Sequence, residues 1–244
     1  MMHEPRLYGE LAPLFPWISR PQEYAAEADC VRRALCEKLG PGRHALLELG
    51  AGAGHLLSHL TADFAVTAVD LSPDMLAQCR KLNPGVPTHV GDMRSVRLGQ
   101  KFQAVFIGDA VAYMLSADDL RSALRTAAAH LDAGGVLLMA PDWFSETFPD
   151  RFVSHDTCCE GTRDVTFIEY CHDPDPSDTT AETVMFFLVR DGGRLRIEQD
   201  RHTEGVFSRQ TWLRLMEEAG FTADTRPYVA AEYAALELLV GVLR

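Results

Sequence analysis

The stretch LLELGAGAG, residues 46–54, joins a hydrophobic run to three glycines that alternate with alanines. His44 to Leu49 has the character of a strand that is covered on both faces of a sheet. Residues Gly54 to Leu60 then supply a helix. Because glycine has no Cβ, a turn with three glycines lets the backbone approach a ligand closely. The stretch therefore predicts a ligand-binding turn between a buried strand and a helix.

Strands and helices alternate on both sides of this turn. Apolar residues recur at helical spacing from Tyr24 to Leu39, and Gly40-Pro41-Gly42 ends that helix. Further strands are expected over 65–69, 87–90, 104–107 and 136–140, and helices over 73–82 and 117–131. Such alternation is typical of a doubly wound, mostly parallel α/β sheet.

The pattern changes after Phe152. Strands are expected over 165–171, 184–190 and 195–202, with Asp191-Gly192-Gly193 as a hairpin turn between the last two. Residues 173–180 are rich in Asp, Pro, Ser and Thr and predict a loop. We interpret this region as an antiparallel β subdomain inserted before a helix at 208–219. Closing strands at 222–228 and 236–243 bring the main sheet to seven strands.

We expect a single domain over residues 1–244. It comprises an N-terminal lid and helix (1–40), a cofactor-binding core (41–150), the inserted strands (151–206), and a closing helix with two strands (207–244).

Composition restricts the partners and the compartment. A formal net charge of -12 argues against a nucleic-acid partner, because such proteins usually display a basic face. No apolar run approaches the roughly twenty residues that span a bilayer, so we expect no membrane segment. The six cysteines lack CxxC spacing, and adjacent Cys158 and Cys159 are awkward as paired ligands. We expect no metal, a cytoplasmic location and a small-molecule substrate.

Acids follow successive strands and indicate the kind of ligand. Glu48 and Asp70 end the first two strands, Asp92 follows the third, and Asp109 follows the fourth. The carboxyl edge of such a sheet is where ligands bind, and a carboxylate there can accept both hydroxyls of a ribose. A dinucleotide is disfavoured, because His55 stands where its fingerprint has a third glycine. A nucleoside without phosphates fits better.

The motifs LELGAGAG, VDLSPDM, GDMR and LDAGG occur in that order between Tyr24 and Ala140. In this span the chain resembles the class I S-adenosylmethionine-dependent methyltransferases, which have a Rossmann-like fold. The resemblance implies S-adenosylmethionine as cofactor, with the glycines under its methionine part, Asp70 on the ribose and Asp92 on the adenine amine. The cofactor-binding residues that we infer are Tyr8, Trp17, Glu48, Gly50, Ala51, Gly52, Gly54, Asp70, Leu71, Met75, Asp92, Met93, Ile107, Gly108 and Asp109, with Tyr8 and Trp17 as parts of the lid.

A resemblance over most of the chain narrows the family. EYAAEA, DLSPDML, GDMR, LGQKF, AYM, PDWFSETF and the Asp200-x-His202 run before a helix are similar to the bacterial nucleotide-linked amino-sugar N-methyltransferases. This implies methyl transfer to an amine. An O-methyltransferase, a nicotinamide-dependent oxidoreductase and a cofactor-binding protein without catalysis are the alternatives.

Methyl transfer from a sulfonium requires alignment of the nucleophile and exclusion of water. Tyr113 and His202 are candidate catalytic residues, and Tyr113, Trp143 and His202 are candidate substrate contacts. Each also has a structural interpretation: the two aromatic residues as half-buried packing residues, and the histidine as a residue of the sheet. The inserted strands form either a wall of the acceptor pocket or the face of a homodimer.

Overall fold

The computed structural model describes residues 5–149, 151–228 and 236–244. Its main sheet has seven strands in the order β10-β11-β5-β4-β1-β2-β3, and β1 to β5 are parallel. β11 runs antiparallel to both β5 and β10. The mostly parallel α/β fold is thereby confirmed. The strands are β1 (Ala45–Leu49), β2 (Ala65–Asp70), β3 (Thr88–Val90), β4 (Phe102–Ile107), β5 (Leu131–Met139), β10 (Phe221–Tyr228) and β11 (Leu236–Leu243).

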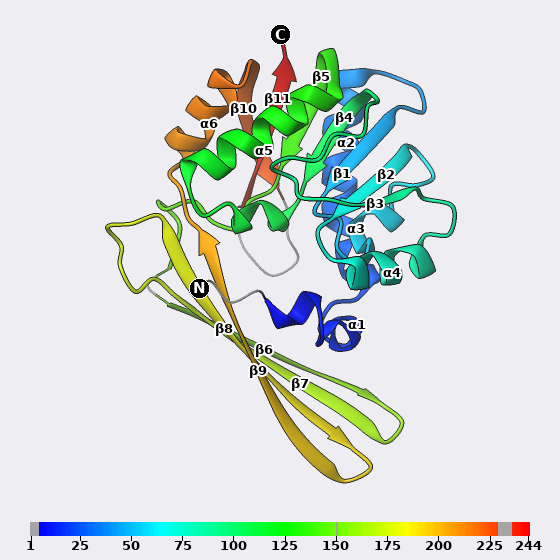
Figure 1. The fold of residues 1–244 in the computed structure, drawn as a ribbon, viewed down its shortest axis with the longest axis vertical. Helices are drawn as coiled ribbons and strands as arrows, with labels where there is room; N and C mark the ends of the chain where they lie inside the picture. Colours follow the sequence, from blue (N-terminus) through cyan, green and yellow to red (C-terminus); the bar gives the residue numbers. More distant parts are fainter. Residues whose placement is uncertain (1–4, 150, 229–235) are drawn as a thin grey trace.

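Helices cover both faces of this sheet (Figure 1). On one face, α2 (Ala25–Leu39), α3 (His55–Ser58) and α4 (Pro73–Leu82) enclose a core with side chains of β1 and β2. On the other face, α5 (Ala117–His130) and α6 (Arg209–Glu218) pack over β4 and β5. None of the described helices is long and apolar enough to cross a membrane. The continuous apolar run of β1 follows from this double coverage.

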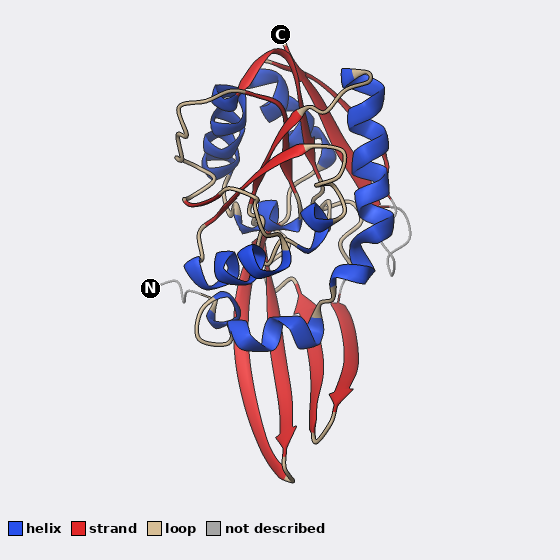
Figure 2. Ribbon diagram, turned by 90° about the vertical axis from the view of Figure 1, so that its right-hand side faces the viewer, coloured by secondary structure: helices blue, strands red, loops and turns tan. Residues whose placement is uncertain are grey.

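A second sheet contains β6 (Arg151–Glu160), β7 (Arg163–His172), β8 (Thr180–Asp191) and β9 (Arg194–Gly205), all antiparallel and in that order. It extends away from the helical layers (Figures 1 and 2). The turn between β8 and β9 has positive φ at Gly192 and Gly193, as its sequence predicts. β6 is missing from the strands expected above, because its sequence RFVSHDTCCE is mixed in character; backbone pairing with β7 holds it as an edge strand.

Several element boundaries also differ from expectation, and β8 begins at Thr180, four residues before its expected start. α3 ends at Ser58 after a single turn, although the sequence predicts a helix to Leu60. β5 begins at Leu131, before the expected start at Val136, and a register shift against β4 accommodates the extra residues.

The N-terminal segment lies between the two sheets (Figure 1). It contains the short helices η1 (Arg6–Tyr8), η2 (Ala12–Leu14), α1 (Phe15–Ile18) and η3 (Pro21–Tyr24). Leu7, Leu11 and Leu14 pack against apolar side chains of the four-stranded sheet. On its other side, Ala12 contacts Ala53 of the glycine turn and Met75 of α4. The segment therefore joins the inserted sheet to the glycine turn.

Candidate functional site

A cavity of about 1380 Å³ lies where the carboxyl ends of the parallel strands meet the N-terminal segment and the four-stranded sheet. Its volume exceeds the roughly 300–1,000 Å³ that is usual for one small-molecule site. The glycine turn and the ends of β2 and β4 line one side, and residues of β6, β7 and β9 line another. The cavity therefore has room for two molecules side by side.

The glycine turn owes its shape to left-handed backbone at three positions. Gly50, Gly52 and Gly54 have φ of 78°, 52° and 74°, a region that other residues rarely adopt. A Cβ on Gly50 would lie 2.5 Å from the Cβ of Ala110, and one on Gly54 would lie 2.6 Å from the Sγ of Cys79. Gly50 and Gly54 thus allow close packing behind the turn, while Gly50 and Gly52 also line the cavity.

Asp70 connects this turn to the end of β2. Its Oδ2 accepts the backbone N–H of Gly52 at 2.7 Å, and its Oδ1 accepts the N–H of Ser72 at 2.8 Å. Burial raises the pKa of the Asp70 carboxyl, although these hydrogen bonds oppose the rise. Each carboxylate oxygen retains a further lone pair for a ligand hydroxyl.

Glu48 is the most unusual acid in the cavity wall. It is 4% exposed, and its Oε2 is buried without a hydrogen-bond partner among the described residues. Burial, followed by the charges of Asp109 and Asp70, raises the pKa of Glu48 well above its usual value. A buried acceptor without a donor is costly. Glu48 therefore offers a free acceptor oxygen to a donor or a positive charge of a ligand.

The acids after β3 and β4 also border the cavity. The Asp92 carboxylate accepts bonds from Arg94, including one at 2.6 Å from Nη2, and this lowers the pKa of Asp92. Asp109 begins η4 (Asp109–Tyr113), and burial raises the pKa of its carboxyl. Asp92 is therefore an ionised acceptor at the rim, whereas Asp109 borders the open cavity at the end of β4.

These residues fit a nucleoside that carries a positive charge. The glycine cradle gives close backbone approach, Asp70 offers two acceptor oxygens, and the orphaned oxygen of Glu48 demands a cationic or hydrogen-donating group. S-adenosylmethionine has a ribose, an ammonium group and a sulfonium. The arrangement is unsuited to a pyrophosphate, which the carboxylates would repel.

The structure brings most of the residues expected at the site to the cavity wall. They are Tyr8, Glu48, Gly50, Ala51, Gly52, Asp70, Leu71, Met75, Asp92, Met93, Gly108, Asp109, Tyr113 and Trp143. Leu71 is 67% exposed, which leaves its side chain accessible to a flat ring.

Four of the expected site residues lie behind the wall or away from it. Gly54 packs against α4, and Ile107 is fully buried at the end of β4. Trp17 packs with the apolar side chains of the four-stranded sheet, and the guanidinium of Arg163 stacks over its ring. His202 is fully buried and contacts Tyr113. The expectation that Trp17 closes over the cofactor does not match this placement, because its apolar ring packs against the nearer sheet.

A group of carboxyls on the cavity wall is absent from the residues expected above: Glu27, Asp142, Glu169 and Glu204. Burial raises the pKa of Glu204 to about 7 and that of Glu27 to about 7. Burial, with the neighbouring charges of Asp109, Glu204 and Glu169, raises the pKa of Asp142 well above its usual value. Only Asp142, directly after β5, stands at a position that the strand-end rule could have identified.

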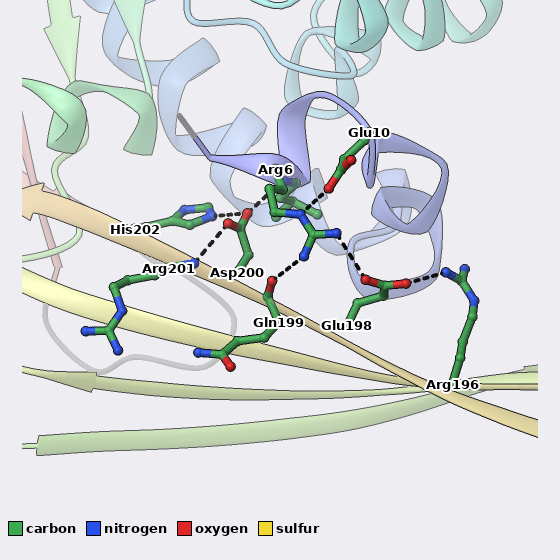
Figure 3. A network of polar contacts seen from close by, with 9 residues as sticks. Arg6, Glu10, Arg196, Glu198, Gln199, Asp200, Arg201 and His202 are labelled. Carbon is green, nitrogen blue, oxygen red and sulfur yellow. Dashed lines mark hydrogen bonds and ion pairs between the residues drawn. The ribbon is translucent and has the colours of Figure 1, made fainter. Parts of the chain in front are cut away.

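The N-terminal segment is fixed to β9 by polar contacts (Figure 3). Arg6 Nη1 donates to the carbonyl of Gln199 at 2.7 Å, Nη2 donates to Glu198 at 3.1 Å, and Nε donates to Glu10. The N–H of Leu7 donates to Asp200 Oδ2 at 2.7 Å. These contacts place Tyr8 on the cavity wall, where Ser72 donates to its backbone carbonyl.

Comparisons with known proteins agree with this geometry. Residues 46–135 match a family described as a methyltransferase domain. The dTDP-3-amino-3,4,6-trideoxy-alpha-D-glucopyranose N,N-dimethyltransferase of Streptomyces venezuelae is 35% identical over 218 residues, which cover 88% of each chain. The sugar N-methyltransferase KedS8 from Streptoalloteichus has a TM-score of 0.86 at 28% identity, covering 100% of this chain and 95% of its own. For CalS10, an amino pentose methyltransferase from Micromonospora echinaspora with S-adenosylmethionine bound, the TM-score is 0.77 at 28% identity, with 100% and 98% covered.

Proposed function

We propose that the acceptor is the amino group of a nucleotide-linked amino sugar, because this chain belongs to the amino-sugar N-methyltransferases. These form part of the class I S-adenosylmethionine-dependent methyltransferases. The chain is a methyltransferase, and S-adenosylmethionine is its cofactor. Three relatives are named as N,N-dimethyltransferases of dTDP-linked amino sugars. We extend the proposal to two successive transfers to one nitrogen.

The cofactor end of the proposed site is built from the parallel sheet. Asp70 binds the ribose hydroxyls, Leu71 and Met75 line the adenine side, and Asp92 with Met93 meets the adenine edge. Glu48, Gly108 and Asp109 surround the methionine end, with Ala51 and the glycines beneath it and Tyr8 opposite. When bound, the cofactor supplies an electrophilic methyl group on a sulfonium. The chain's part is to hold the acceptor nitrogen in line with that group and to exclude water.

The carboxyl-rich wall is the observation that carries the choice of an amine. Asp109, Asp142 and Glu204 border one cavity, and within the described part of the chain no Arg or Lys forms an ion pair with them. The raised pKa values of Asp142 and Glu204 reflect unfavourable desolvation of negative charge. A cationic amino sugar would relieve that cost, whereas a neutral hydroxyl acceptor would not. Tyr113 and Trp143 border the same region and would contact the sugar.

We also propose a homodimer formed by the outward face of the four-stranded sheet. Directly paired residues of neighbouring strands share a face, and Val165, Phe187 and Val189 face the N-terminal segment. The opposite face carries large exposed apolar side chains: Val153, Tyr170, Leu195 and Ile197. Several large apolar side chains exposed on one face are typical of an interaction surface.

Cytoplasmic action is a further part of the proposal. All six cysteines are free thiols, and three of them, Cys30, Cys79 and Cys171, are buried. Free thiols of this number are usual in a reducing compartment.

Incubation with S-adenosylmethionine and the dTDP-linked 3-amino sugar used by the Streptomyces venezuelae relative tests the proposal. Mass spectrometry should show one and then two added methyl groups. The matched control is the same sugar nucleotide with a 3-hydroxyl, which should remain unmodified. Methylation of the hydroxyl compound alone would establish an O-methyltransferase, and binding of S-adenosylhomocysteine without any turnover would leave a binding role only.

A further inference from the structure

A chain of side-chain hydrogen bonds leads from the cavity wall into the protein. Tyr8 Oη lies 2.8 Å from Tyr113 Oη, and Tyr113 Oη lies 2.6 Å from His202 Nδ1. His202 Nε2 lies 2.9 Å from Asp200 Oδ2. Tyr8 and Tyr113 line the cavity, whereas His202 and Asp200 are 0% and 2% exposed. The four residues come from η1, η4 and β9, so the folded arrangement alone brings them together.

The buried end of this series of hydrogen bonds, at Asp200, fixes the direction of each bond in it. Although burial opposes it, hydrogen bonds from His202 and from the Leu7 N–H lower the pKa of Asp200, which is therefore an acceptor only. His202 Nε2 must then carry a hydrogen, which leaves Nδ1 of the neutral ring to accept from Tyr113. Tyr113 in turn accepts from Tyr8. In this state the Tyr8 oxygen can only accept a further bond from the cavity.

In this hydrogen-bonded series the imidazole of His202 is the group that takes up a proton. The phenols of Tyr8 and Tyr113 only pass the proton on. Burial raises the pKa of Tyr8 and of Tyr113 well above the usual value, and the charge of Asp109 adds to the rise in both. A tyrosinate at either position is therefore strongly disfavoured. A proton that reaches Tyr8 can be accepted only if the phenolic hydrogens move together toward His202.

We propose that Tyr8, Tyr113 and His202 form a proton relay, oriented by Asp200, that deprotonates the acceptor amine before methyl transfer. This inference rests on the amine acceptor proposed above. An N–H bond of the bound ammonium breaks, its electron pair stays on nitrogen, and the proton passes to Tyr8 Oη. The Tyr8 hydrogen moves to Tyr113 Oη, and the Tyr113 hydrogen moves to His202 Nδ1. The imidazolium is held by Asp200, and the nitrogen lone pair is free to attack.

Titratable and charged groups of several elements lie near the relay. They include Asp200 and Glu204 on β9, Asp109 on η4, Cys171 on β7 and the two phenols. The guanidinium of Arg6 on η1 is the cation beside them, and it donates to the carbonyl of Gln199, next to Asp200. The Asp200 carboxylate, which accepts the Nε2 hydrogen of His202 at 2.9 Å, is placed to pair with the imidazolium that the relay forms.

Rates as a function of pH for Tyr113→Phe and His202→Asn test the relay, with the dTDP-linked 3-amino sugar as acceptor. Each variant interrupts the chain but keeps a side chain of similar shape. At pH 7 we expect kcat/KM to fall about 10²-fold, at the low end of general acid–base effects. The deficit should shrink about tenfold per pH unit as more acceptor arrives as free amine. Affinity for S-adenosylhomocysteine should stay within about twofold of wild type.

His130→Asn is the matched control. His130 is also a buried imidazole with two hydrogen-bond partners, Thr126 and Leu98. It lies on α5, outside the cavity wall. It should show no pH-dependent deficit. A deficit that is the same at every pH in both relay variants would overturn the relay while leaving amine methylation intact. Absence of amine methylation by the wild-type enzyme would remove the proposed function and the relay with it.

Nitrogen NMR of the imidazoles gives a readout that does not require turnover. The relay requires the Nε2–H tautomer of His202 at neutral pH, with an Nδ1 resonance that shifts when Tyr113 is replaced by Phe. Assignment of the Nδ1–H tautomer would contradict it.

Discussion

The two sheets shape the cavity by different means. The parallel sheet contributes a backbone turn with three left-handed glycines, and carboxylates whose places are fixed locally by consecutive strand ends. The antiparallel sheet contributes side chains from strands, such as Glu169 and Glu204, whose positions depend on pairing between strands distant in sequence. A backbone site tolerates almost no added atom, whereas a side-chain site can change its chemistry without changing its shape. Substitutions in the glycine turn should therefore disturb the shape of the site, whereas substitutions on the four-stranded sheet should change its chemistry.

Gly50→Ala should have the largest effect. The new Cβ would meet the Cβ of Ala110 at 2.5 Å, and the residue would keep a φ that alanine disfavours. Relief of the clash must move the turn or η4, so we expect affinity for S-adenosylhomocysteine to fall at least about 10²-fold. Isothermal titration calorimetry measures this directly.

The matched control is Gly85→Ala. Gly85 also has a positive φ, 94°, but a Cβ there would meet nothing within 4 Å. It should cost about 1 kcal/mol of stability from strain, with unchanged cofactor affinity. Equal affinity losses in the two variants would mean that strain, not close packing, governs the turn.

Asp70→Asn should have the second-largest effect on cofactor affinity. The amide oxygen can still accept one backbone N–H, but the charge and the second acceptor oxygen are lost. Hydrogen bonds to a charged group contribute about 1.5–3 kcal/mol, so the affinity should fall about tenfold to a hundredfold. Asp118→Asn, at a carboxylate 90% exposed on α5, is the control. Near-normal affinity of Asp70→Asn would remove the ribose from this position.

The contrast between the sheets also explains what the sequence reveals. Glu48, the glycines and Asp70 lie within 25 residues, and local rules for strand ends identify them. The cavity positions of Glu204 and Glu169 depend on the register of β7, β8 and β9, which the sequence alone does not give. An aromatic residue in an N-terminal lid predicts a place for Trp17 over the cofactor. Its neighbours on the four-stranded sheet are distant in sequence, so the sequence does not reveal its packing there.

Glu204→Gln tests the side-chain end of the cavity. An unfolded glutamate ionises near its ordinary 4.5, whereas burial raises the pKa of folded Glu204 to about 7. Between these values the folded state binds more protons, so the free energy of unfolding falls as pH rises. The amide removes this loss and can still accept from Thr183.

The variant should therefore melt a few degrees higher than wild type at pH 8 and equally at pH 4, by scanning calorimetry. Its KM for the amine should rise about tenfold because an interaction with a cation is lost. A lower melting temperature at pH 8, or an unchanged KM, would mean that Glu204 serves the fold rather than the acceptor.

Ile197→Glu should have the smallest effect on ligand affinity and a clear effect on assembly. Ile197 is 63% exposed on the outward face and pairs directly with Leu188 of β8, far from the carboxyl wall. A charge there would have to be buried in the proposed dimer, so light scattering should give a monomer mass for the variant and a dimer mass for wild type. Leu82→Glu, at an exposed leucine of α4, should remain dimeric. If the wild-type protein is itself a monomer, the outward face has no role in self-association. A variant that stays dimeric would place the interface elsewhere. In either case, unchanged affinity for S-adenosylhomocysteine would show that this face does not affect the glycine turn that holds the cofactor.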